Sequence, residues 1–200
     1  HQRVRLLLAH AQRPRARRAD LAWLGLGLGL GLGLGLGLGL GLGLGLADLA
    51  RTEALPEPSL LGAALGARPV QAWGGMFYAA RFETPEEVEA LKPNQRALKD
   101  LGVPGEGWDR GNFGCFALGG DGVDVTSRFF APGSGIDEDP ATGSWHTMLA
   151  RVMSERFGKT DLKCHQAFPG RGAFIDTRLE GDRVKLIGTS VTVIEGSFTL

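Results

Sequence analysis

Between Leu24 and Leu46 the chain alternates leucine and glycine without interruption. This stretch carries no charge and has the length of a membrane-spanning helix, which needs roughly 20 residues. However, each glycine disfavours a helix in water by about 1 kcal/mol relative to alanine. In a strand, the alternation would place every leucine on one face. We expect a low-complexity insertion outside the folded domain, with a membrane segment and an aggregation-prone strand as the alternatives.

The residues before this tract form a second unusual segment. Residues 1–20 are rich in arginine and contain no acidic residue before Asp20. Such a composition suits an organelle transit peptide, but the segment lacks serine and opens with His1 instead of methionine. We therefore expect a leader without folded structure, and a chain that is a fragment. The expected division is a leader over 1–20, a Gly-Leu tract over 21–47 and a folded lobe over 48–200.

Charge and cysteine content narrow the classes of partner. The 22 basic residues balance the 22 acidic ones, and the one dense basic run lies at 13–18, so we expect no nucleic-acid partner. Cys115 and Cys164 lie far apart and match no metal-ligand spacing, and the four histidines form no cluster. We expect no disulfide, no metal ion and a cytoplasmic protein.

The lobe alternates between helical and strand patterns. Helices are predicted over 57–66 with Ser59 as the N-cap and Gly66 as the stop, over 84–94 with Thr84 as the N-cap, and over 95–103. A fourth helix is predicted over 145–157, with Gly158 as its C-cap and a core face at helical spacing made of Trp145, Leu149, Val152, Met153 and Phe157. Strands are predicted over 70–82, as a pair or as one bent strand, over 111–120, and over 122–132 with alternating faces. Further strands are predicted over 162–168, 172–180 and 183–200, with "EGDR" as a hairpin turn. This order indicates an α+β fold and excludes a doubly wound parallel sheet.

The run "EDPATGSWH" at 138–146 places two carboxylates before a helix start. The first N–H groups of a helix have no acceptor within it, and they attract anions. Gly143 permits close approach of a ligand, Thr142 and Ser144 offer hydroxyls, Asp139 would stand beside a bound anion, and His146 would tune or relay a proton. The alternative is an ordinary helix cap with Glu138 as a solvated surface charge.

Longer motifs around this run carry a family resemblance. The segment "DVTSRFFAPGSGIDEDPATGSWHTMLA" closely resembles the signature of PhzF-like proteins, the phenazine-biosynthesis isomerase family. The segments "VEALKPNQRALKDL" and "CHQAFPGRGAFIDTRLEGDRVKLIGTSVTVIEGSFTL" are similar to its middle and closing parts. The resemblance covers residues 55–200.

The resemblance implies a diaminopimelate epimerase-like lobe, in which a mixed sheet wraps around a central helix beginning near Trp145. By match to the motif, Asp139 and Ser144 would be catalytic, and Thr142, Gly143 and His146 would bind substrate. No cofactor is implied. The substrate would be a small carboxylate-bearing metabolite.

The chain also departs from the family pattern. The family's base lies in a Ser-Glu-Thr motif of a first lobe, opposite a Gly-His-Ala-Thr cradle, and neither motif occurs here. The first lobe is thus expected to be missing or replaced, with Glu53 and Glu57 as the nearest substitutes for the base. Trp145 stands where a small residue is usual, and we expect it to narrow the cleft.

We expect a PhzF-like isomerase fragment that transfers a proton without a cofactor and is weak or inactive as this chain alone. The alternatives are a non-enzymatic lobe that acts as a binding or association module, and a membrane-tethered lobe. Apolar surface left open by a missing lobe favours self-association, so a homodimer is expected.

Overall fold

The computed structural model describes the backbone of residues 2–8, 53–54, 58–75, 77–101, 111–189 and 191–198, and side chains within 61–75, 77–101 and 111–189. The Gly-Leu tract and Glu57 lie outside these ranges, and so does the side chain of Glu53.

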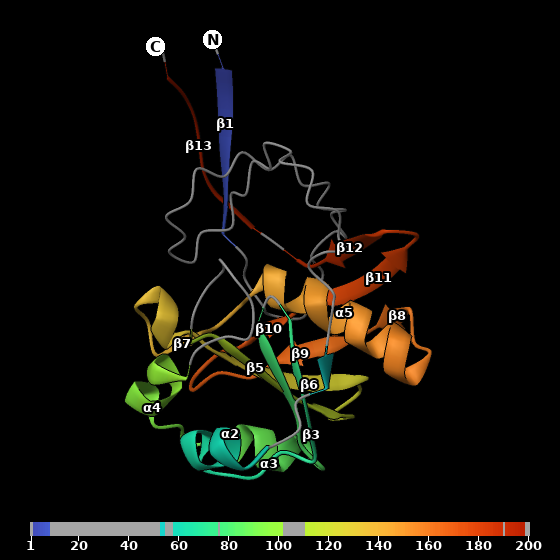
Figure 1. The fold of residues 1–200 in the computed structure, drawn as a ribbon. Helices are drawn as coiled ribbons and strands as arrows, with labels where there is room; N and C mark the ends of the chain where they lie inside the picture. The colour runs from blue at the N-terminus through green and yellow to red at the C-terminus, as the bar shows by residue number, and fades with distance from the viewer. Residues whose placement is uncertain are drawn as a thin grey trace.

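A mixed sheet of eight strands forms the centre of the fold (Figure 1). The strands lie in the order β10-β9-β6-β5-β4-β3-β2, with β7 beside β6. Their bounds are β2 Glu53–Ala54, β3 Gln71–Gly74, β4 Tyr78–Arg81, β5 Phe113–Leu118, β6 Val125–Phe130, β7 Glu138–Asp139, β9 Cys164–Gln166 and β10 Ala173–Phe174. The β4–β5 and β6–β9 pairs are parallel and the other pairs are antiparallel, so the sheet is not doubly wound.

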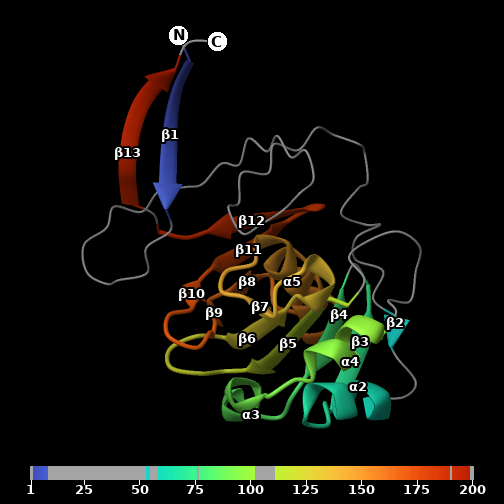
Figure 2. The ribbon, with the colours of Figure 1, turned by 90° about the vertical axis from the view of Figure 1, so that its left-hand side faces the viewer.

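Helix α5, Gly143–Phe157, lies between this sheet and a smaller one (Figures 1 and 2). The smaller sheet has the order β12-β11-β8, with β8 Asp161–Leu162, β11 Asp176–Glu180 and β12 Arg183–Ile187. Strands β11 and β12 form the antiparallel hairpin predicted around "EGDR". The predicted arrangement of strands around a central helix is thus present.

Three short helices cover the other face of the large sheet (Figure 1). They are α2 Pro58–Leu65, α3 Pro85–Ala90 and α4 Gln95–Asp100. Because helices lie on both faces, all six residues of β6 are buried. The prediction of two alternating faces holds for β6, since Phe129 packs with α5 and Phe130 with the short helices, but neither face is open to solvent.

Local signals predicted several helix ends correctly, but α3 ends at Ala90 and not at 94, and α2 and α5 begin elsewhere than predicted. The Thr84 hydroxyl accepts the N–H of Glu87 at 3.3 Å and caps α3 as predicted, and Gly66 follows α2 with φ of 82°. The expected N-cap at Ser59 is wrong, because α2 already begins at Pro58. Proline suits the first helical position, since its missing N–H would have no acceptor there.

The buried side of α5 matches the predicted helical spacing. Leu149, Val152 and Met153 are buried, and Gly158 ends the helix with φ of 67°. Trp145 is also fully buried, against β5 and β6, where a Cβ on Gly114 would lie 2.2 Å from its ring. The expectation that Trp145 narrows a cleft is therefore wrong, because glycine in β5 makes room for the indole inside the core.

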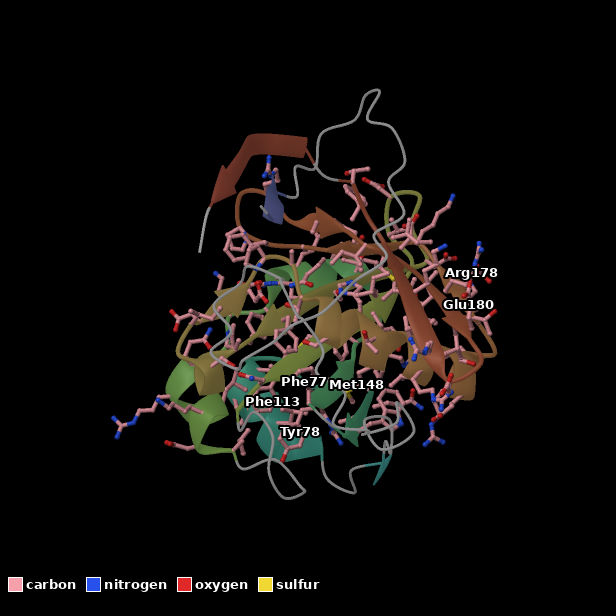
Figure 3. All side chains as sticks on the ribbon, turned by 90° about the horizontal axis from the view of Figure 1, so that it is seen from above. Phe77, Tyr78, Phe113, Met148, Arg178 and Glu180 are labelled. Atoms are coloured by element: carbon pink, nitrogen blue, oxygen red, sulfur yellow. The ribbon has the colours of Figure 1, made fainter. Side chains whose placement is uncertain are left out.

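Aromatic contacts also tie neighbouring strands together. Tyr78 and Phe113 face each other across the parallel β4–β5 pair, with ring centroids 4.9 Å apart and planes 2° apart (Figure 3). Such pairs add about 0.5–1.5 kcal/mol beyond the burial of their area.

The ends of the chain form a separate ribbon of two strands. Strand β1, Gln2–Leu8, pairs antiparallel with β13, Val191–Phe198, and projects away from the rest of the molecule (Figure 2). The expected leader without folded structure is therefore wrong for Gln2–Leu8. Within the described ranges, no helix is long and apolar enough to cross a membrane.

Candidate functional site

The predicted site residues lie where β7 leads into α5. Strand β7 pairs with the end of β6, opposing Asp139 to Phe129. The chain then turns, and Thr142 takes an extended conformation as the N-cap of α5. The structure therefore brings Asp139, Thr142, Gly143 and Ser144 together around one helix N-terminus.

Helix α5 begins two residues earlier than predicted, at Gly143 instead of Trp145. Gly143 and Ser144 are its first two residues, and Ser144 is exposed. The first bond within the helix joins the His146 N–H to the Thr142 carbonyl at 3.2 Å. The N–H groups of Gly143, Ser144 and Trp145 thus have no acceptor within the helix, and the Thr142 side chain does not cap them.

Asp139 is half-buried and held by the turn that follows it. Its Oδ2 accepts the Thr142 hydroxyl at 2.8 Å, and its Oδ1 accepts the Ala141 N–H at 3.3 Å. The carboxylate is therefore oriented by internal donors beside the helix N-terminus instead of pointing freely into solvent.

Gln166 is a site residue that sequence reasoning did not single out. It is fully buried in β9, and its Oε1 accepts the Thr142 N–H at 2.9 Å. Its Nε2 donates to the Asp139 carbonyl at 2.5 Å and to the Thr142 hydroxyl at 3.1 Å. Gln166 lies 24 positions after Thr142, and only the pairing of β9 with β6 brings it near, so no local pattern marks it.

His146 lies behind the turn, not at its surface. The ring is fully buried, its Nδ1 lies 2.8 Å from the Thr142 carbonyl, and burial lowers its pKa to about 4. The imidazole is therefore neutral at pH 7, and Nδ1 must carry the proton to donate to the carbonyl. Its Nε2 has no partner among the described residues. Its predicted contact with substrate stays a prediction.

Glu138 is not the solvated surface charge of the alternative interpretation. Its two carboxylate oxygens accept from Nε and a terminal nitrogen of Arg128 at 2.7 and 2.8 Å, with side chains only 10% and 8% exposed. The other terminal nitrogen of Arg128 donates to the Glu89 and Leu91 carbonyls at 2.9 and 2.8 Å, at the end of α3. The ion pair fixes β7, and with it Asp139, against β6 and α3.

An apolar side chain flanks the helix N-terminus. A Cβ on Gly143 would lie 3.2 Å from Cδ1 of Leu186 on β12, so the position is tight for any other residue. The glycine thus permits the smaller sheet to approach the first turn of α5.

Two hollows lie away from the predicted site. They are lined by residues of α2, of α3 and of the turn after α2, which includes Gly66 and Arg68, and by none of the predicted site residues. Within the described ranges, no group of three His, Cys, Asp or Glu side chains is placed to hold a metal ion.

Comparison with known proteins gives consistent matches. Residues 75–196 match the family described as phenazine biosynthesis-like protein, PhzC-PhzF. An uncharacterized isomerase of Pseudomonas aeruginosa is 37% identical over 138 residues, covering 68% of this chain and 49% of the relative. An uncharacterized isomerase of Halalkalibacterium halodurans is 30% identical over 144 residues, covering 72% and 52%.

A solved structure agrees with these relatives. The PhzF-family protein of Enterococcus faecalis superposes with a TM-score of 0.65 at 30% identity, covering 76% of this chain and 56% of that one. The match confirms the predicted α+β mixed-sheet fold. The chain spans about half the length of the curated relatives it matches.

Proposed function

Since the chain belongs to the phenazine biosynthesis-like (PhzC-PhzF) family, we propose that it is an isomerase-type lobe that transfers a proton on a small carboxylate-bearing metabolite. Asp139 carries the proton, and the first turn of α5 binds the substrate carboxylate. The proposed reaction uses no cofactor and no metal ion.

The observation that carries this proposal is the first turn of α5. The amides of Gly143 and Ser144 have no acceptor within the helix, and the Thr142 hydroxyl binds Asp139 instead of capping them. A carboxylate there would accept these N–H groups and meet the positive end of the helix dipole. The exposed Ser144 hydroxyl stands ready to donate to the same group.

This arrangement supports proton transfer next to the bound carboxylate. When Asp139 takes a proton from the neighbouring carbon, the electron pair left behind delocalises into the substrate carboxylate. Amide donors fixed at that group stabilise the developing charge. Return of the proton to the other face of the same carbon completes an isomerisation. Where a double bond of the substrate conjugates that carbon with a second one, return of the proton to the second carbon, with a shift of the double bond, does the same.

We further propose that this chain alone is a weak catalyst. Transfer of a proton between two positions is fastest with a positioned group on each side of the substrate. The Ser-Glu-Thr and Gly-His-Ala-Thr motifs expected for the opposing side are absent from the sequence. The alternative is a lobe that binds small carboxylates, or a second copy of itself, without chemistry.

Deuterium exchange tests the proposal. Purified chain is incubated in deuterated water with small carboxylic acids that carry a hydrogen on the carbon next to the carboxyl group. We expect slow incorporation of deuterium by the wild type, and a loss of about 10²–10⁴-fold in Asp139→Asn, the range typical of a general acid or base. Asp137→Asn is the matched control, because Asp137 is exposed and two positions away.

Equal rates in the wild type and Asp139→Asn would remove Asp139 from the mechanism. If the wild type incorporates no deuterium from any acid, the enzymatic proposal fails and the binding module is favoured. Titration with acetate, followed through the Gly143 and Ser144 amide NMR signals, then tests binding alone.

A further inference from the structure

The Gln166 amide joins both ends of the turn that carries Asp139. It is fully buried, and every polar hydrogen on its Nε2 has a partner, one in the Asp139 carbonyl and one in the Thr142 hydroxyl. Its Oε1 accepts the Thr142 N–H. A side chain from β9 thus makes three hydrogen bonds to a turn that β9 does not belong to.

The partners leave only one orientation of this amide. A backbone N–H can only donate, so Oε1 must face Thr142 N. A backbone carbonyl can only accept, so Nε2 must face the Asp139 carbonyl. The second hydrogen of Nε2 then points to the Thr142 oxygen.

This orientation also decides where the Thr142 proton goes. The hydroxyl oxygen accepts from Gln166, and its single hydrogen remains for Asp139 Oδ2, 2.8 Å away. A directed chain therefore runs from Gln166 through Thr142 to one oxygen of Asp139. The other oxygen, Oδ1, has only the longer 3.3 Å contact with the Ala141 N–H and keeps accepting capacity.

We propose that Gln166 is a positioning residue of the site: it directs the Thr142 proton onto Oδ2 of Asp139 and so reserves Oδ1 for the proton that moves during the reaction. The proposal rests on the proposed function of Asp139. Gln166 touches neither the substrate nor the moving proton, and it acts through Thr142.

Gln166→Glu is the sharpest test, because it keeps the size of the side chain and reverses its chemistry. An ionised carboxylate can donate neither to the Asp139 carbonyl nor to the Thr142 hydroxyl, and it accepts the Thr142 proton in competition with Asp139. A protonated carboxyl group, which burial favours, has a single hydrogen for these two acceptors, so the directed chain is broken in either state. Thr142→Val removes the hydroxyl directly. Thr142→Ser is the matched control, since it keeps the hydroxyl, and thermal unfolding identifies variants that do not fold.

In the deuterium exchange assay, we expect Gln166→Glu and Thr142→Val each to lower kcat by on the order of 100-fold, as for a misplaced catalytic group. KM should change less, because the substrate carboxylate binds to other atoms. The double variant should be no slower than the slower single variant, because both break the same chain. Thr142→Ser should retain most of the rate.

Additive losses in the double variant, or losses that only follow thermal stability, would show that Gln166 merely supports the fold and would overturn the proposal. A readout without activity separates this result from failure of the proposed function. The ¹³C chemical shift of the Asp139 carboxyl carbon at pH 7 should change in Gln166→Glu and Thr142→Val, with no further change when both are combined. An unchanged shift in Gln166→Glu overturns the proposal whether or not the wild type exchanges deuterium.

Discussion

Burial affects the pKa of His146 more than its hydrogen bond with the Thr142 carbonyl does. The ring is fully buried, and loss of hydration lowers its pKa to about 4, although the hydrogen bond with the Thr142 carbonyl works in the opposite direction. In the unfolded chain the same imidazole binds a proton near pH 6.5. Acid therefore favours the unfolded state through this one residue.

We predict that the free energy of unfolding falls by about 3 kcal/mol as the pH drops from 6.5 to 4. The reason is that His146 binds a proton in this pH range when the chain is unfolded, but not when the ring is buried in the folded protein. Urea unfolding measured across this range should show the loss in the wild type and a flatter profile in His146→Gln.

Asp124 does not interfere with this measurement. A hydrogen bond from Lys159, then one from the Lys163 N–H, holds the pKa of Asp124 below its usual 3.8, so its stabilising effect is lost only at lower pH. Identical slopes for the wild type and His146→Gln between pH 6.5 and 4 would contradict the assignment to His146.

Residues close in the sequence were the predictable part of the site. Asp139, Thr142, Gly143 and Ser144 span six positions, so a turn and a helix start bring them together without long-range contacts. Gln166 could not be assigned a role, because its three hydrogen bonds depend on the parallel pairing of β9 with β6. A single sequence does not determine that pairing.

At the scale of elements, the Arg128–Glu138 pair connects three of them. Arg128 belongs to β6, Glu138 to β7, and the carbonyls of Glu89 and Leu91 belong to the end of α3. The arginine also lies over the Phe130 ring, 4.8 Å from its centroid. Removal of one partner would leave a buried charge unpaired, which is costlier than loss of an exposed ion pair.

We predict that Arg128→Met lowers the free energy of unfolding by about 3–5 kcal/mol, the range for a broken buried pair. Arg178→Met is the matched control. Arg178 on β11 and Asp161 form an ion pair at the surface, with side chains 51% and 61% exposed, and Figure 3 shows Arg178 at the periphery of the molecule. The control should lose much less than Arg128→Met, because solvent screens an exposed ion pair.

Urea unfolding curves measure both variants. A loss in Arg128→Met as small as that in Arg178→Met would show that β7 and α3 do not depend on the ion pair. The hydrophobic pattern at 122–132 predicted strand β6 but gave Arg128 no role, because the partners of a buried arginine lie on other elements.

Among the helices and strands, the end of a helix was easier to predict from the sequence than the neighbours of a strand in its sheet. Thr84 and Gly158 mark helix ends by rules that act within a few residues. The order of strands in the large sheet depends on which faces can be buried together. The resemblance to the PhzF-like family implied a mixed sheet around a central helix, but neither the resemblance nor the periodicity gave the order of the strands.

At the scale of the whole molecule, the two ends of the chain lie side by side. Gln2 opposes Phe198 and Leu8 opposes Val191, with a register shift between Leu6 and Leu7. We predict that deletion of residues 1–8 removes protection from amide hydrogen exchange within 191–198, because the alternate N–H groups of β13 that point at β1 lose their acceptors. Amides of β5 and β6 should keep their protection, since neither strand contacts β1 in a sheet.

Hydrogen exchange followed by mass spectrometry resolves the two regions. Unchanged protection of 191–198 after the deletion would show that β13 is not paired with β1 in solution. The composition of residues 1–20 did not predict this strand, because an arginine-rich segment is typical of unfolded chain. The strand depends on pairing with β13, which lies at the other end of the sequence.

Because the Trp145 ring lies so close to Gly114, the residues that these two positions can accept depend on each other, although they are 31 residues apart. Any side chain on the strand collides with the indole, while a smaller residue on the helix leaves an empty space that the glycine cannot fill. A substitution at either position alone is therefore destabilising, and we expect the two positions to covary among related proteins. A larger residue at position 114 should occur only together with a residue smaller than tryptophan at position 145.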